Sequence, residues 1–212
     1  MCALLGCQGV RLYHDNCLSR APGSKHTRWH CDDGPGQYMA MEPCEKEGQQ
    51  AVTVWYPLQG NTGPDKGSLI FASLPSSSFS EHGDKKIQRC INSFDIAAME
   101  GCPAVEQSDE YDAFVTDVLR KKGCSLSTAT YELGDVSIHY TDCFHTAGPN
   151  LTHSPRMIIG VTYFADGTMM RVGQPGSEIP AAYSKFCPGC EKGELIATPL
   201  NPLLPHCQEQ LQ

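Results

Sequence analysis

The feature that most constrains the fold of this chain is a succession of short β-type segments separated by turn residues. The segment 51–58 is rich in β-branched and aromatic residues, and 9–14 alternates apolar with polar residues; both patterns are typical of strands. Turn sequences rich in Gly, Pro, Asn and Asp occur at 61–67 and 166–167. Many short strands broken by turns predict a mainly β fold, a sandwich or barrel, and a jelly roll would bring an early strand beside a late one. Further strands are expected at 68–73, 128–133, 136–140, 157–164 and 169–172, a loop at 15–26, and an irregular tail over 173–212.

The segment 108–122 has the pattern of a single amphipathic helix. Ser108 can cap its N-terminus, acidic residues occupy its first turn, and Gly123 follows a basic last turn. Its apolar residues share one face, so we expect a helix that packs on the core and carries no chemistry. The polar stretches 33–49 and 75–107 are expected to be long loops. The first of them directly follows residues 30–32 and is expected to lie over the mouth of the functional site.

Composition limits the partners and the compartment. The 212 residues carry a net charge of −8, which argues against nucleic acid and anionic membrane surfaces as partners. No apolar run is long enough for a membrane span, and the N-terminus lacks the basic segment of a signal peptide. Without secretion, most of the 12 cysteines should be free thiols, and the end of the chain, Gln210–Gln212, is not a peroxisomal signal. We therefore expect a cytoplasmic protein, and the sequence does not indicate its oligomeric state.

The tripeptide His30-Cys31-Asp32 is a candidate metal-binding motif. Residues two apart in a strand point to the same face, so His30 and Asp32 would offer one nitrogen and one oxygen ligand while Cys31 turns away. A second imidazole from downstream would complete a two-histidine, one-carboxylate facial triad, which leaves positions open on Fe(II) for oxygen activation. His145 is the favoured partner, and His139 is its nearest competitor, although a histidine in a strand more often packs than ligates.

The cysteines offer a second, weaker hypothesis. Cys187 and Cys190 form a CxxC pair, and His206 and Cys207 follow nearby, so the four could bind zinc in a metal-binding or redox protein. A thioredoxin-like redox role is disfavoured because no βαβ pattern surrounds the pair.

Several blocks together resemble the phytanoyl-CoA dioxygenase family of Fe(II)/2-oxoglutarate oxygenases. The resemblance covers residues 6–202 in blocks and is weakest at 75–127. It rests on 10–15 followed by 28–32, on 52–55 followed by 67–71, on 134–135 through 145–150, and on 154–156 running into 161–166.

The resemblance implies a double-stranded β-helix, a jelly roll of the cupin-like kind, with one or a few packing helices. It implies that His30, Asp32 and His145 ligate iron, and that Arg156 binds the distal carboxylate of 2-oxoglutarate through paired hydrogen bonds. Thr53 and Trp55, on one face of their strand, would line the cosubstrate pocket. The implied activity is that of a dioxygenase that hydroxylates a small-molecule or lipid-like substrate and releases succinate and CO2. It would use Fe(II), 2-oxoglutarate and O2, with ascorbate as a stimulant.

Departures from the family pattern keep a non-catalytic alternative open. Residues 1–212 would form a single domain of the family that lacks its usual N-terminal helical region, because His30 comes so early. Cys31 stands where the family often has Gln, and Ala147 where it often has a small hydroxyl residue. The alternative is a catalytically degenerate or truncated jelly-roll binding domain that keeps the fold.

Overall fold

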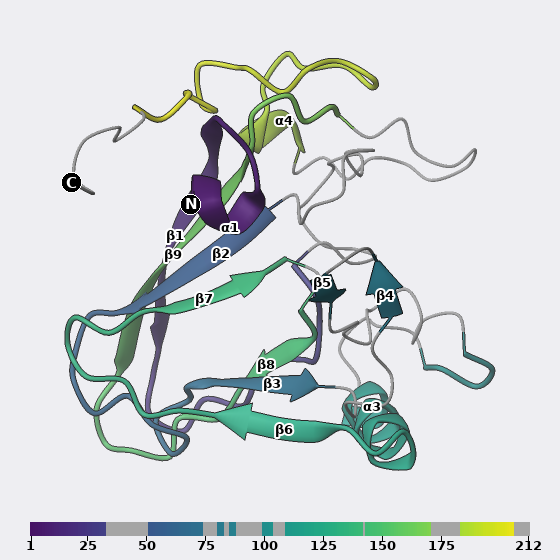
Figure 1. The fold of residues 1–212 in the computed structure, drawn as a ribbon. Coiled ribbons are helices and arrows are strands. Elements are labelled where there is room, and N and C mark those ends of the chain that lie inside the picture. Colours follow the sequence, from purple (N-terminus) through teal and green to yellow (C-terminus); the bar gives the residue numbers. More distant parts are fainter. Residues whose placement is uncertain are drawn as a thin grey trace.

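Two antiparallel sheets face each other in the computed structural model, which describes residues 1–32, 51–73, 80–82, 85–87, 99–103, 109–141, 143–170 and 183–205. Figure 1 shows them as two layers, with α3 next to the end of the smaller sheet. The four-stranded sheet has the order β1 (Val10–Arg20), β9 (Arg156–Ala165), β2 (Ala51–Pro57) and β7 (Ser137–Tyr140). The three-stranded sheet has the order β6 (Ser125–Thr128), β3 (Leu69–Ser73) and β8 (His145–Ala147). A separate hairpin joins β4 (Ser80–His82) to β5 (Lys85–Ile87), and the helices are α1 (Cys2–Leu5), α3 (Asp109–Lys121) and α4 (Tyr183–Phe186).

The pairing of β1 with β9 joins the beginning of the chain to its last third. It runs from Val10 opposite Ala165 to Arg20 opposite Arg156, with an irregularity between Leu12 and His14. The predicted loop at 15–26 is therefore wrong over residues 15–20. Those side chains are mostly exposed and polar, and the strand is held by backbone hydrogen bonds to β9, which the side-chain pattern does not report.

Most other predicted elements are confirmed to within one or two residues at each end. These are the strands at 51–58, 68–73, 136–140 and 157–164 and the helix at 108–122. The strand predicted at 128–133 is wrong, because β6 ends at Thr128 and Tyr131 makes only a single bridge to Thr62. In the segment 169–172, Met169 forms one bridge to Leu195, and the rest beyond Met170 lies outside the described residues. The loop predicted at 33–49 also lies outside them, and the insertion at 75–107 contains β4 and β5.

Two apolar clusters form much of the core. One packs Trp29, Cys31 and Phe144 against the inner face of α3, which confirms the core-packing role predicted for that helix. The other contains Tyr13, Met170 and Cys187, among others. Burial raises the pKa of the Cys187 thiol to about 12. The described cysteines are free thiols, and in the described part of the chain they join no cluster of three or more metal ligands; His206 and Cys207 lie outside it. None of the described helices is long and apolar enough to cross a membrane.

Candidate metal centre and its cavity

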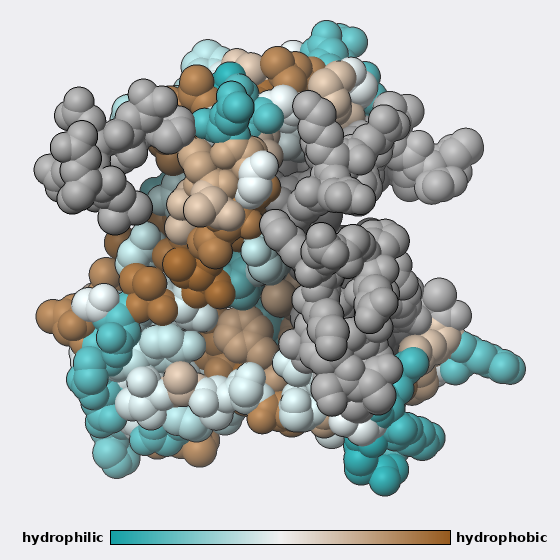
Figure 2. Space-filling model, in the orientation of Figure 1, coloured by the Kyte–Doolittle hydropathy of each residue, from teal (hydrophilic) through white to brown (hydrophobic). Residues whose placement is uncertain are grey.

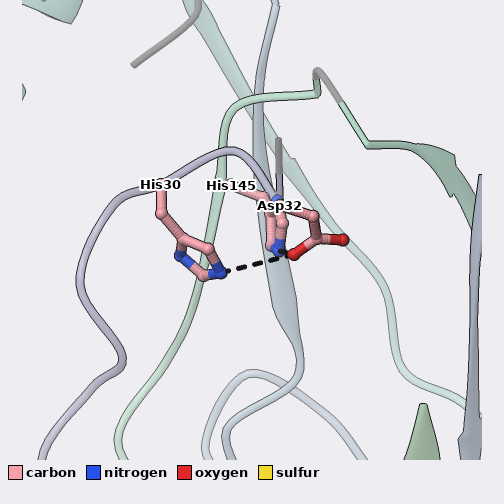
Figure 3. A group of neighbouring side chains, drawn as sticks. All are labelled: His30, Asp32 and His145. Atoms are coloured by element: carbon pink, nitrogen blue, oxygen red, sulfur yellow. Dashed lines mark ion pairs between the residues drawn. The ribbon is translucent and has the colours of Figure 1, made fainter. Parts of the chain in front are cut away.

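Backbone pairing brings His30 against His145, 115 residues further along the chain. Each residue donates its backbone N–H to the carbonyl of the other at 2.9 Å, and the two rings lie 4.3 Å apart between centroids. Asp32 completes the group, and one ligand atom from each of the three residues lies within 4.8 Å of the others. Figure 3 shows the three side chains pointing toward one another. The motif was predicted to lie in a strand, but His30 forms only an isolated bridge. The alternation of sides still holds, because Cys31 is fully buried in the apolar cluster with Trp29.

A contact between Nδ1 and a backbone carbonyl orients each of the two imidazoles. His30 Nδ1 lies 2.7 Å from the carbonyl of Arg28, and His145 Nδ1 lies 2.9 Å from the carbonyl of Cys143. A carbonyl can only accept, so each Nδ1 carries the proton and each Nε2 presents a lone pair. Those two Nε2 atoms lie 3.7 and 3.8 Å from the same oxygen of Asp32, Oδ1. This is the tautomer that a pair of metal-binding histidines requires.

His30, Asp32 and His145 together form what we call the metal corner, and its charges favour a cation. Burial, together with the neighbouring charge of His30, lowers the pKa of His145 to about 3, so its ring is neutral at neutral pH. Burial alone would raise the pKa of Asp32, but its contacts with the surrounding imidazoles hold the pKa of that carboxyl well below its usual range. An ionised carboxylate beside a neutral imidazole is the protonation state in which such groups ligate a divalent metal.

An acidic residue of α3 fixes the segment that leads into His30. Asp112 is buried, and its Oδ2 accepts from His26 Nε2 and Arg28 at 2.7 Å each, while its Oδ1 lies 3.4 Å from the backbone N of Trp29. From the sequence, Asp112 is only one of the acidic residues in the first turn of the helix, and His26 carries no signal of a contact. The carboxylate in the first helical turn is a signal for a helix N-terminus, but nothing in the sequence pairs it with residues 26–29.

One cavity of about 660 Å³ connects the metal corner with a buried arginine. Arg156 begins β9, as predicted, is 3% exposed, and donates from one terminal nitrogen to the carbonyl of Gly67. Its Nε is buried and has no hydrogen-bond partner among the described residues, and its guanidinium carbon lies 5.5 Å from the centre of the Trp55 ring. Figure 2 shows the surface hollowed between the two layers, with apolar side chains around the recess.

A second arginine shares that end of the cavity. Arg20 lies opposite Arg156 in the β1–β9 register and also lines the cavity. Burial and the charge of Arg20 lower the pKa of Arg156 to about 10, which still leaves it protonated at neutral pH. In the described part of the chain, neither arginine pairs with a carboxylate, and Arg20 donates instead to the carbonyls of Lys25, Ala147 and Gly148. Two guanidinium groups in one partly apolar cavity create a site for an anion.

The remaining candidate residues also line this cavity, in places that the sequence only partly indicated. Trp55 lies at the arginine end, whereas Thr53 donates its hydroxyl to Asp32 Oδ2 at 2.6 Å and so belongs to the metal corner. His139 is buried in the corner, with its Nε2 3.4 Å from the same Oδ2. His14, which the sequence did not single out, lies in β1, lines the cavity and packs against Phe186.

Compared with known proteins, the structure is similar to several solved structures. No protein-family model and no curated protein matches the chain. Among solved structures, it is similar to the non-heme alpha ketoglutarate dependent carbocyclase SnoK from nogalamycin biosynthesis, with a TM-score of 0.59 and 19% identity over 94% of this chain and 64% of that one. It is also similar to the epimerase SnoN in complex with Fe3+, alpha ketoglutarate and nogalamycin RO, with a TM-score of 0.55 and 17% identity over 92% and 65% of the two chains.

These likenesses establish the fold. The chain spans just under two thirds of the length of those two enzymes. The jelly roll predicted from the sequence is confirmed by the two facing antiparallel sheets and by these neighbours. The neighbours are named as non-haem enzymes that depend on alpha-ketoglutarate, which is 2-oxoglutarate, and the narrower phytanoyl-CoA dioxygenase family remains a prediction. The chain thus has the jelly-roll fold of non-haem, 2-oxoglutarate-dependent enzymes.

Proposed function

We propose that this protein is an Fe(II)/2-oxoglutarate-dependent dioxygenase that hydroxylates a small-molecule or lipid-like substrate. One observation carries the proposal: a His-Asp-His corner and a buried arginine with an unpartnered Nε line the same cavity. Such an enzyme needs a cation site and an anion site within the length of one 2-oxoglutarate molecule.

The donor set suits iron. Two imidazole nitrogens and one carboxylate oxygen are the ligands of the facial triad, which is associated with Fe(II) oxygenases. Two ligand atoms bound at about 2.2 Å cannot be further apart than about 4.4 Å. The distances from Asp32 Oδ1 to the Nε2 atoms of His30 and His145, 3.7 and 3.8 Å, meet that limit. Bound iron would supply the activation of O2, for which 2-oxoglutarate provides the electrons.

The arginine end suits a carboxylate. Arg156 is held by the carbonyl of Gly67 on one side and by the Trp55 ring on another, so its free edge has little freedom to turn away. The unpartnered Nε would regain a hydrogen bond from the distal carboxylate of 2-oxoglutarate. Leu69 and Ile158 line the same cavity and would exclude water from the chain of the cosubstrate.

The substrate would occupy the part of the cavity that 2-oxoglutarate leaves free, along the β1 wall at His14 and Asn16. SnoK is a carbocyclase and SnoN an epimerase, both of nogalamycin biosynthesis, which supports a small-molecule substrate here. The mass of the product, measured by mass spectrometry, distinguishes these reactions. Hydroxylation adds one oxygen atom, whereas epimerisation leaves the mass unchanged.

The test is an anaerobic titration of the protein with Fe(II) and then 2-oxoglutarate, followed in the visible range. Chelation of a 2-oxo acid by triad iron should produce a metal-to-ligand charge-transfer band, and admission of O2 should release succinate. We expect the band in the wild type, its loss in His145→Ala, and a higher 2-oxoglutarate requirement in Arg156→Ala. A folded wild-type protein with neither band nor succinate would contradict the proposal and favour the jelly-roll binding domain.

A further inference from the structure

The two carboxylate oxygens of Asp32 have different surroundings. Oδ1 faces the corner, 3.7 Å from His30 Nε2 and 3.8 Å from His145 Nε2. Oδ2 faces the four-stranded sheet, where the hydroxyl of Thr53 donates to it at 2.6 Å and His139 Nε2 lies 3.4 Å away. We propose that Thr53, supported by Thr162, and His139 are positioning residues that make Asp32 bind the metal through Oδ1 alone. This inference rests on the proposed metal site.

The three positioning residues form a row across neighbouring strands. Thr53 on β2 lies opposite Thr162 on β9 and opposite His139 on β7. Directly opposed residues in antiparallel strands share a face, and all three line the cavity. The row therefore comes from strand register, which keeps the groups at fixed spacing on a rigid element.

The direction of the hydrogen bonds in this row is determined by chemistry. The ionised carboxylate of Asp32 can only accept, so Thr53 gives its single hydroxyl proton to Oδ2. Thr162 Oγ1 lies 3.1 Å from Thr53 Oγ1, and Thr53 can then only accept from it. Thr162 thus donates to Thr53 and Thr53 donates to Asp32, in a chain that polarises toward the carboxylate.

His139 has the position of a donor to the carboxylate and not of a third nitrogen ligand. It is 6% exposed, and neither of its ring nitrogens has a hydrogen-bond partner among the described residues. Its Nε2 faces Oδ2, the oxygen turned away from the other two imidazoles, and it is not part of the group whose ligand atoms converge. A proton on Nε2 directed at Oδ2 gives that nitrogen the partner it otherwise lacks.

Hydrogen bonds that keep Oδ2 away from the metal would determine how many coordination positions stay open. A carboxylate that used both oxygens would fill a fourth coordination position, whereas one oxygen leaves three open on an octahedral ion. A chelating 2-oxo acid and O2 together need those three. Groups that hydrogen-bond a ligating carboxylate typically contribute ten- to hundred-fold to metal affinity.

The experiment compares Co(II) binding by the wild type, Thr53→Val, Thr53→Ser and Thr168→Val, since the d–d spectrum of Co(II) responds to the atoms that coordinate the ion and to their geometry. Thr168→Val is the control, because Thr168 is a buried threonine whose hydroxyl donates to the carbonyl of Ala165 and which does not line the cavity. We expect Thr53→Val to weaken Co(II) binding about ten-fold or more and to shift the d–d bands, because Oδ2 would then replace a water on the ion. Thr53→Ser, which keeps the hydroxyl, and Thr168→Val should both resemble the wild type. His139→Phe should change the bands in the same direction as Thr53→Val.

The outcomes are distinguishable. If Thr53→Val binds Co(II) with wild-type affinity and spectrum, the positioning role is wrong while the metal site stands. If Thr53→Ser loses as much as Thr53→Val, the effect belongs to packing and the role of the hydroxyl is wrong. If wild-type protein binds no Co(II), the proposed function fails and the positioning role with it.

Discussion

The two ends of the cavity differ in how their charges are balanced. At the metal corner, an ionised carboxylate lies among imidazoles and a hydroxyl, an arrangement that attracts a cation. At the other end, Arg156 and Arg20 bring two positive charges together, with no carboxylate paired to either in the described part of the chain. Among the described residues, the metal corner therefore lacks a cation and the arginine end lacks an anion. A molecule that chelates a metal with one end and offers a carboxylate at the other would satisfy both.

The largest effect is expected from removing a ligand at the metal corner. His145→Ala should abolish Fe(II) binding, because two remaining side-chain ligands do not form a facial triad. Anaerobic calorimetry with Fe(II) measures the loss, and His153→Ala, at an exposed histidine, is the control. Retention of iron by His145→Ala together with its loss in His139→Ala would mean that the corner is built on His139 instead.

At the arginine end, Arg156→Ala should weaken 2-oxoglutarate binding by about 10- to 100-fold, since hydrogen bonds to charged groups contribute about 1.5–3 kcal/mol. Fe(II) affinity without cosubstrate should stay at the wild-type value, because Arg156 contacts none of the ligands. Calorimetric titration of the Co(II)-loaded protein with 2-oxoglutarate provides the measurement. Arg120→Ala, on the exposed face of α3, is the control. Equal weakening of metal and cosubstrate would break the division into two independent ends.

The support of the metal corner can be tested at Asp112. Asp112→Asn removes the charge that binds His26 and Arg28. We therefore expect the free energy of unfolding, measured by urea denaturation, to fall by about 1.5–3 kcal/mol. Fe(II) affinity should fall as the segment before His30 loosens. Asp117→Asn on the same helix is the matched control, since Asp117 pairs with lysine and arginine on the exposed face and should give no measurable change. Equal effects of the two substitutions would show that Asp112 does not anchor this segment.

The smallest effect is expected from the second arginine. Arg20→Gln should weaken 2-oxoglutarate binding by less than about ten-fold, because the terminal nitrogens of Arg20 donate to backbone carbonyls and to the Thr27 hydroxyl, so that it acts on the cosubstrate mainly through its charge. The difference from wild type should shrink as salt is added. A loss as large as that of Arg156→Ala, independent of salt, would mean that both arginines grip the carboxylate directly.

Local patterns in the sequence were sufficient for much of the fold. The β-branched run at 51–58 and the helical face of 108–122 predict β2 and α3, because both depend on which neighbours along the chain share a face. The prediction failed where long-range pairing overrides composition. Residues 15–20 look like a loop but continue β1, and residues 129–133 look like a strand but have no continuous partner.

The sequence by itself determined the chemistry available: a His-x-Asp motif, a distal histidine and an arginine at the start of a strand. The tertiary structure decided which groups stand behind them. Thr53, His139 and Thr162 are separated by up to 109 residues, and no pattern in the chain places them in one row. Asp112 reaches the segment before His30 only because α3 packs there. Periodicity along a chain determines which side a residue faces, whereas the register between strands, set by hydrogen bonds between distant segments, determines what it faces.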